Sequence, residues 1–180
     1  WPMKKLLIVI VALGAVAPRA QAQGIRIASW TFDSLTVSST ASTTPVPTAG
    51  SLAADVGVGS ATGLHTSAST VWSTPAGNGS AKALSVNNWS VGDYFEFRVS
   101  TLQLQGISVE YDQTSSSTGP RDFQLLIGTD GSQFTPFGPT QTVLANAAAT
   151  SPAVRSAWSA AGTVQSAYHY SFDMSGVTGL

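Results

Sequence analysis

The feature that most constrains the fold of this chain is an alternation of apolar and polar residues with a period of two. In its clearest run, Phe95, Phe97 and Val99 alternate with Glu96 and Arg98. Successive side chains of a β-strand point to opposite faces, so such a run predicts a strand with one buried face and one solvent face. The alternation occurs over residues 94–99, 107–112, 123–127 and 168–174.

The alternating segments, with turn signals between them and no amphipathic helix, predict an all-β protein built as an antiparallel β-sandwich of jelly-roll type. We expect a further strand over 25–33, a long loop or edge excursion over 34–50, and only a weak strand signal over 51–73. A hairpin turn is expected at 129–132, where Asp-Gly stands between strand patterns. The expected shared interior consists of Phe95, Phe97, Ile107, Val109, Phe123 and Leu125.

The beginning of the chain has the organisation of a cleavable secretory signal peptide. Lys4 and Lys5 form a short basic start, and an apolar run over 6–17 follows. This run is shorter than the roughly 20 residues that a membrane-spanning helix needs. Small residues at Ala20 and Ala22 suit a signal peptidase, so cleavage is expected after Ala22.

These features predict a signal peptide over 1–22, in which Trp1 and Pro2 are translated upstream residues ahead of Met3. One β-sandwich domain, incomplete at its C-terminus, is expected over 23–180. The expected location is extracellular or on the cell surface, with no membrane span in the mature part. Three of the eight basic residues lie in the leader, which leaves five against nine acidic residues. Phosphate binding requires clustered Lys and Arg, so nucleic acid is not an expected partner. The chain contains no cysteine, which excludes disulfides and thiolate sites.

Catalytic groups are sparse, and we expect no enzyme activity. His65 and His169 are far apart in the sequence, and neither belongs to a spaced metal motif. Glu110 and Asp112 would share one strand face at about 7 Å between Cα atoms, a spacing that can suit an acid and a base. The alternative is that both lie on a solvent face.

The polar loop over 113–122 holds the leading candidates for ligand contact, Arg121 and Asp122. A guanidinium and a carboxylate can grip paired sugar hydroxyls, although the two side chains could instead pair with each other or with neighbouring loops and fix the turn. Trp72 and Trp89 could stack on a sugar ring, as could Trp158, or they could fill the core. The candidate ligand-binding residues are Arg121, Asp122, Trp72, Trp89 and Asp112.

No cofactor is expected, with one open possibility of a structural calcium ion. Asp33 and Asp173 lie near the two ends of the domain and carry the oxygen ligands that Ca²⁺ prefers. Two carboxylates alone do not make a cage, so these are weak candidates.

Several ordered motifs carry a resemblance to a known family. They are Asn88-Trp89-Ser90-Val91-Gly92-Asp93-Tyr94-Phe95-Glu96-Phe97, Gly106-Ile107-Ser108-Val109, Asp112-Gln113-Thr114-Ser115, Thr118-Gly119-Pro120-Arg121-Asp122-Phe123 and Thr129-Asp130-Gly131. Over roughly residues 28–180 the chain resembles a bacterial secreted domain found in proteins with a PEP-CTERM sorting tail. The resemblance implies a jelly-roll-like sandwich similar in plan to galactose-binding and carbohydrate-binding modules. It also implies a further strand and a sorting tail, which this sequence does not contain, so truncation is the expectation.

The expected function is a secreted, non-catalytic module that binds carbohydrate or extracellular polysaccharide. One alternative is a structural surface protein of the cell envelope or its exopolysaccharide, anchored by the sorting tail. Another is an extracellular hydrolase whose catalytic residues lie outside this sequence.

Overall fold

The structure is a computed structural model that describes residues 4–11, 24–151 and 154–180. The expected cleavage position after Ala22 and the upstream residues Trp1 and Pro2 lie outside these ranges. The described chain is built of short and long strands with one 3₁₀ turn, which confirms the all-β prediction. The strands are β1 (Lys4–Val11), β2 (Ala28–Ser29), β3 (Thr36–Val37), β4 (Pro47–Ala49), β5 (Val56–Gly57), β6 (Gly59–Leu64), β7 (Trp72–Ser73), β8 (Ser85–Val86), β9 (Tyr94–Ser100), β10 (Ser108–Asp112), β11 (Asp122–Gly128), β12 (Thr135–Pro136), β13 (Gln141–Thr142) and β14 (His169–Asp173), with the 3₁₀ turn η1 over Ser166–Tyr168.

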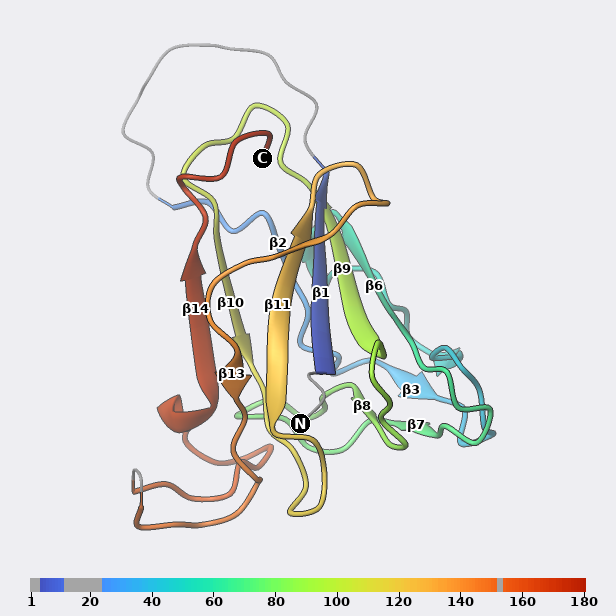
Figure 1. Ribbon diagram of the computed structural model, residues 1–180. Helices are drawn as coiled ribbons and strands as arrows, with labels where there is room; N and C mark the ends of the chain where they lie inside the picture. The colour runs from blue at the N-terminus through green and yellow to red at the C-terminus, as the bar shows by residue number, and fades with distance from the viewer. Residues whose placement is uncertain (1–3, 12–23, 152–153) are drawn as a thin grey trace.

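The largest sheet has the strand order β12–β11–β1–β9–β6, and β13 also pairs with β11 (Figure 1). Four alternating segments of the sequence became β9, β10, β11 and β14, as predicted. The pairings of β6 with β9 and of β11 with β12 and β13 are antiparallel. The pairings of β1 with β9 and β11 are parallel. The expected arrangement was antiparallel throughout, and it holds for the other pairings of this sheet but not for those of β1.

The other strands form four two-stranded sheets: β10–β14, β2–β5, β3–β4 and β7–β8. The segment 34–50, expected as a loop or edge excursion, contains the β3–β4 hairpin and places Leu35 and Val37 in the core. The strand expected over 25–33 is reduced to β2. Its extension stops because Phe32 has a φ of 61°, outside the β region, while the Asp55 carboxylate accepts the backbone N–H groups that follow β2.

Within residues 24–151 and 154–180, the buried side chains form two main clusters rather than one. The first lies between the main sheet and the β10–β14 pair and is centred on Ile107 and Leu125, with Phe97 and Val109 packed against it. The second is centred on Leu35, Val37 and Trp72, with Phe95 packed against it. Four of the six residues expected to share an interior therefore do so, while Phe95 lies in the second cluster.

Phe123 is the sixth expected core residue, and it is buried with an edge-to-face contact to Trp89. The strand β11 that carries it is buried on both faces, not on one as its alternation predicted. The segment after the 129–132 turn folds back over the second face, where Gln124 Nε2 donates to the backbone oxygens of Phe137 and Gly138 at 3.0 and 3.2 Å. The alternation did not reveal this cover because the covering residues belong to a later part of the chain.

Glu96 was expected to face solvent, and this expectation is wrong because only 4% of the residue is exposed. Its face of β9 also carries Tyr94, which packs with Leu126 and Phe134 in a small third cluster. Arg98 Nε donates to the Glu96 carboxylate, so the buried charge has a partner.

Candidate functional site

A cleft of about 1700 Å³ opens between the two main clusters, over the inner face of β9. Aromatic and aliphatic side chains from β9 and β10 line it, among them Phe95, Phe97, Val109 and Tyr111. The interior divides here because Phe97 packs into one cluster and Phe95, two residues earlier, packs into the other. The cleft therefore has an apolar floor that the strand alternation supplies.

The polar loop predicted to carry ligand contacts forms part of the same cleft. Arg121 and Asp122 both line it, and Asp122 also begins β11. The loop is held against the segment before residue 146, because Ser115 N and Thr114 Oγ1 both donate to the carbonyl of Leu144, at 3.0 and 2.9 Å.

The side chains of Arg121 and Asp122 differ in how much of their bonding capacity is used. Arg121 is exposed, and none of the ion pairs formed within residues 4–11, 24–151 and 154–180 includes its guanidinium. Asp122 is half-buried and accepts one long hydrogen bond of 3.4 Å from the Thr142 hydroxyl. The Arg121 donors are thus directed to solvent rather than to a turn-fixing ion pair with Asp122.

Asp112 lines the cleft too, and it already has a partner. Its Oδ1 atom lies 2.9 Å from His169 Nδ1, and the two residues are cross-strand neighbours in the β10–β14 pair. Glu110 shares the outer face with Asp112, as predicted for residues two apart on a strand. The pair of His169 and Asp112 is partly exposed, so its energetic contribution is small.

One backbone edge of β10 also borders the cleft. The Met174 N–H donates to the Ile107 carbonyl and the Gln113 N–H donates to the Tyr168 carbonyl, at the two ends of the β10–β14 pair. This register places every second residue between Ile107 and Gln113 with its N–H and C=O on the opposite edge of β10. Glu110 and Asp112 are two of these residues, and no labelled strand pairs with that edge. The cleft wall therefore presents main-chain donors and acceptors as well as side chains.

Trp30, Trp89 and Trp158 line the cleft, whereas Trp72 does not. Trp30 is half-buried and donates its indole N–H to the Leu52 carbonyl at 3.1 Å. Trp89 is half-buried, with its indole N–H bonded to the Val86 carbonyl at 3.2 Å. Trp158 is also half-buried and lines the same cleft. Trp72 lies in the second cluster with 1% of its surface exposed and donates to the Ser42 carbonyl at 2.9 Å. We therefore leave Trp72 out of the candidate binding surface.

Two non-glycine residues of the cleft wall have backbone angles that L-amino acids rarely adopt. Phe32 has a φ of 61° and Asn88 a φ of 52°. Such conformations carry a cost and are concentrated at ligand-binding and catalytic sites in proteins. Asn88 is held there by its side-chain amide, which donates to the Ser69 carbonyl at 2.8 Å.

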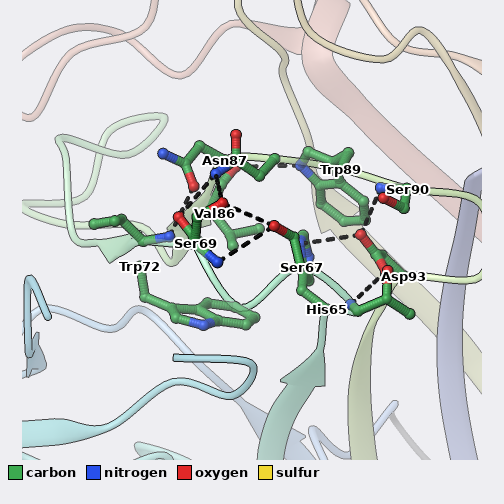
Figure 2. A network of polar contacts seen from close by, with 12 residues as sticks. His65, Ser67, Ser69, Trp72, Val86, Asn87, Trp89, Ser90 and Asp93 are labelled. Atoms are coloured by element: carbon green, nitrogen blue, oxygen red, sulfur yellow. Dashed lines mark hydrogen bonds and ion pairs between the residues drawn. The ribbon is translucent and has the colours of Figure 1, made fainter. Parts of the chain in front are cut away.

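The sequence reasoning missed a buried pair of His65 and Asp93, which lies beside the cleft residue Trp89 (Figure 2). Both residues are fully buried, and His65 Nδ1 lies 3.3 Å from Asp93 Oδ2. The imidazole also contacts the rings of Trp72 and Trp89 edge-on, at centroid distances of 5.2 and 4.4 Å. An isolated histidine in a serine-rich segment gave no sequence signal for this contact, because its partner is 28 residues away.

Asp93 is the centre of that buried network. It accepts hydrogen bonds from the backbone N–H groups of Thr66 and Ser90, at 2.9 and 2.5 Å, and from the Thr66 hydroxyl at 3.1 Å. Neither His65 nor Asp93 lines the cleft. The pair is fully buried and packs against Trp89, so we assign it a structural role.

The two weak calcium candidates each accept a hydrogen bond from a backbone N–H group, distant in sequence for Asp33 and local for Asp173. Asp33 accepts a hydrogen bond from the Lys82 backbone N–H at 3.0 Å. Asp173 accepts from the Ser175 backbone N–H at 2.8 Å, and this bond lowers the pKa of the Asp173 carboxyl. Within the described ranges, no three acidic or histidine side chains gather in an arrangement that could hold a metal ion.

None of the helical structure among the described residues is long and apolar enough to cross a membrane. No family model, no curated protein and no solved structure matches this chain.

Proposed function

We propose that the protein is a secreted, non-catalytic carbohydrate-binding module of jelly-roll type, and that the cleft between its two main clusters is the binding site. The observation that carries the proposal is the convergence of Trp89, Trp158, Arg121, Asp122 and Asp112 on one cleft. Four of these five are the ligand-binding residues that the sequence alone predicts, and they come from separate parts of the chain.

The chemistry of the cleft suits a sugar because it combines apolar faces with directed polar groups. Indole rings stack on the apolar face of a pyranose, while a guanidinium and carboxylates bond to its hydroxyls. Arg121 offers donors that are not used in an ion pair within the described chain. The edge of β10 that pairs with no labelled strand adds main-chain N–H donors and C=O acceptors. These groups can bond to sugar hydroxyls that accept or donate a hydrogen bond.

The size of the cleft favours a segment of polysaccharide over a single sugar. Sites for small molecules usually measure roughly 300–1,000 Å³. A cleft of about 1700 Å³ exceeds this range and has room for several linked sugar units. Its net negative surroundings, with Asp112 and Asp122 on the rim, favour a neutral glycan over an acidic one.

The test is glycan binding by the folded chain, measured by calorimetry or affinity electrophoresis on a panel of neutral polysaccharides. We expect Arg121→Ala to weaken binding by about tenfold or more, because one charge-assisted hydrogen bond contributes roughly 1.5–3 kcal/mol. Trp158→Ala should weaken binding to a comparable degree through loss of stacking.

The matched control is Arg26→Ala, which removes an exposed arginine that does not line the cleft. Its affinity should equal that of the unmodified chain. Absence of binding to every glycan tested would contradict the proposal and would favour the structural surface protein. Equal losses for Arg121→Ala and Arg26→Ala would show that charge alone, and not the cleft, governs binding.

A further inference from the structure

Strand β1 occupies a position that no other segment of the described chain fills. It lies between β9 and β11 (Figure 1), pairing with β11 over Lys4–Val9 and with β9 over Leu7–Val11. The strands β9 and β11 make no pairing with each other. Both neighbours run parallel to β1, whereas every other pairing between labelled strands is antiparallel.

All of β1 also belongs to the segment that the sequence predicts as a removable leader, with Lys4 and Lys5 in its basic start and residues 6–11 in its apolar run. If the leader is cleaved after Ala22, the exported domain loses the strand at the middle of its largest sheet. Two rows of main-chain donors and acceptors, one on β9 and one on β11, then lose their partners at once. An unpaired strand edge is a ready template for another extended segment.

The gap is held open from both sides of the sheet. On the inner side, residues of β9 and β11 such as Phe97 and Leu125 are fixed in the first cluster with β10 and β14. On the outer side, Tyr94 of β9 packs with Leu126 of β11 and with Phe134.

The outer edges of the two strands are also in use. The far edge of β9 is paired with β6, and β11 is paired with β12 and β13. Strands that flank an intervening strand lie about 9–10 Å apart, and bringing β9 and β11 together would require one half of the sheet to shift by about 4.8 Å against these contacts.

We propose that the gap between β9 and β11 is a strand-acceptor site, and that in the processed protein it binds an extended apolar segment of another polypeptide. Main-chain hydrogen bonds to both edges would provide affinity, as in other complexes formed by strand addition. On the inner face the strands that flank the gap carry apolar residues such as Phe97 and Leu125, whereas the outer face includes Glu96 and Arg98, which pair with each other. The donor segment must therefore be apolar on its inner face, along the six residues over which β1 pairs with β11. The proposal depends on leader removal and is independent of glycan binding.

The experiment uses the full chain with a protease recognition sequence introduced within residues 12–22. The chain is folded, cut, freed of the released segment by gel filtration in urea, returned to buffer, and mixed with a fluorescein-labelled synthetic peptide that has the sequence of residues 4–11. Fluorescence anisotropy then measures uptake of the peptide. We expect the cut chain to take up the peptide and the uncut chain to exclude it, because the covalently linked strand already occupies the gap.

The matched control is the same peptide carrying Ile8→Pro. Ile8 pairs with both neighbouring strands, and proline removes a ladder hydrogen bond there and cannot sit in a central strand. Its uptake should be at least about tenfold weaker. Equal uptake of the two peptides would overturn the proposal, since it would indicate non-specific adhesion to apolar surface.

Hydrogen exchange on the cut chain separates the remaining outcomes. If adding the peptide slows amide exchange in β9 and β11, the result supports the proposal. This also holds if the cut chain has unfolded and the peptide restores its fold. No uptake, with β9 and β11 already protected, would show that the gap closes by itself. Dimerisation of the cut chain without peptide would assign the gap to a second copy and would also overturn the proposal. Glycan binding measured on the same samples tests the cleft separately.

Discussion

At the scale of single residues, the buried Tyr168 and the half-buried Tyr111 have hydroxyl groups in opposite situations. The Tyr168 hydroxyl lies 3.2–3.3 Å from the carbonyl oxygens of Ala145, Ala147 and Ser156. The Tyr111 hydroxyl is buried with no hydrogen-bond partner among the described residues, while its ring stacks on Tyr170 and Phe172 at centroid distances of 5.4 and 5.9 Å.

The same substitution should therefore have different effects at the two positions. Tyr168→Phe removes a satisfied hydrogen bond and should lower the free energy of unfolding by about 1 kcal/mol. Tyr111→Phe keeps the ring stack and removes only an unpaired polar atom, so the free energy of unfolding should stay the same or rise. Urea unfolding of the two variants checks the prediction, and a larger loss for Tyr111→Phe would contradict the described packing.

Tyr111 also gives the protein a sensitivity to alkaline pH. Burial raises the pKa of Tyr111, with a smaller contribution from Tyr170, whose own pKa burial also raises. Above the ordinary value of 10.0, the unfolded chain releases these protons while the folded chain retains them. The unfolded state then binds fewer protons, so the free energy of unfolding falls as pH rises. Tyr111→Phe should flatten this decline above about pH 10 in urea unfolding curves measured over a pH series.

Asp93 is the residue on which the region beside the cleft depends most. Asp93→Ala would leave two backbone N–H donors without their acceptor and would remove the carboxylate that lies 3.3 Å from the buried His65 Nδ1. The free energy of unfolding should fall by about 3 kcal/mol or more, which thermal or urea unfolding would measure. The control is Asp173→Ala, since Asp173 is an exposed acceptor for one local N–H group. Similar behaviour of the two variants would contradict the central role of Asp93.

At the scale of elements, the glycines of β6 explain why its sequence signal was weak. A Cβ atom at Gly59 would lie 2.9 Å from the Trp30 ring, and one at Gly63 would collide with the ring of Trp72. The strand lacks side chains at these positions because two indoles fill the space. A pattern based on alternating apolar side chains cannot detect such a strand.

Gly63→Ala tests this account of β6. The added methyl group would meet both Trp72 and the Tyr94 carbonyl, and overpacking of this kind typically costs about 1–3 kcal/mol. The free energy of unfolding should fall by that amount in urea titrations. Gly176→Ala is the matched control, because a Cβ atom there meets nothing within 4 Å. An unchanged stability for Gly63→Ala would show that Trp72 has more room than the structure gives it.

At the scale of the whole molecule, the division of the interior into two main clusters creates the candidate site. A single continuous core would leave no cleft above β9, and the residues of the polar loop would lie at an ordinary surface. The strand-acceptor gap arises from a different feature, since it is set by strand order rather than by the division of the core. The two proposals can therefore fail independently.

The sequence alone determined the long strands β9, β10, β11 and β14, because period-two alternation is a local property that reports burial on one face of a strand. It also indicated the loop that carries Arg121 and Asp122. Only the tertiary structure decided that Trp72 is a core residue, that Glu96 and both faces of β11 are buried, that His65 meets Asp93, and that Trp158 joins the cleft. Each of these depends on a contact between residues far apart in the chain, and a local pattern contains no information about which distant segment will cover it.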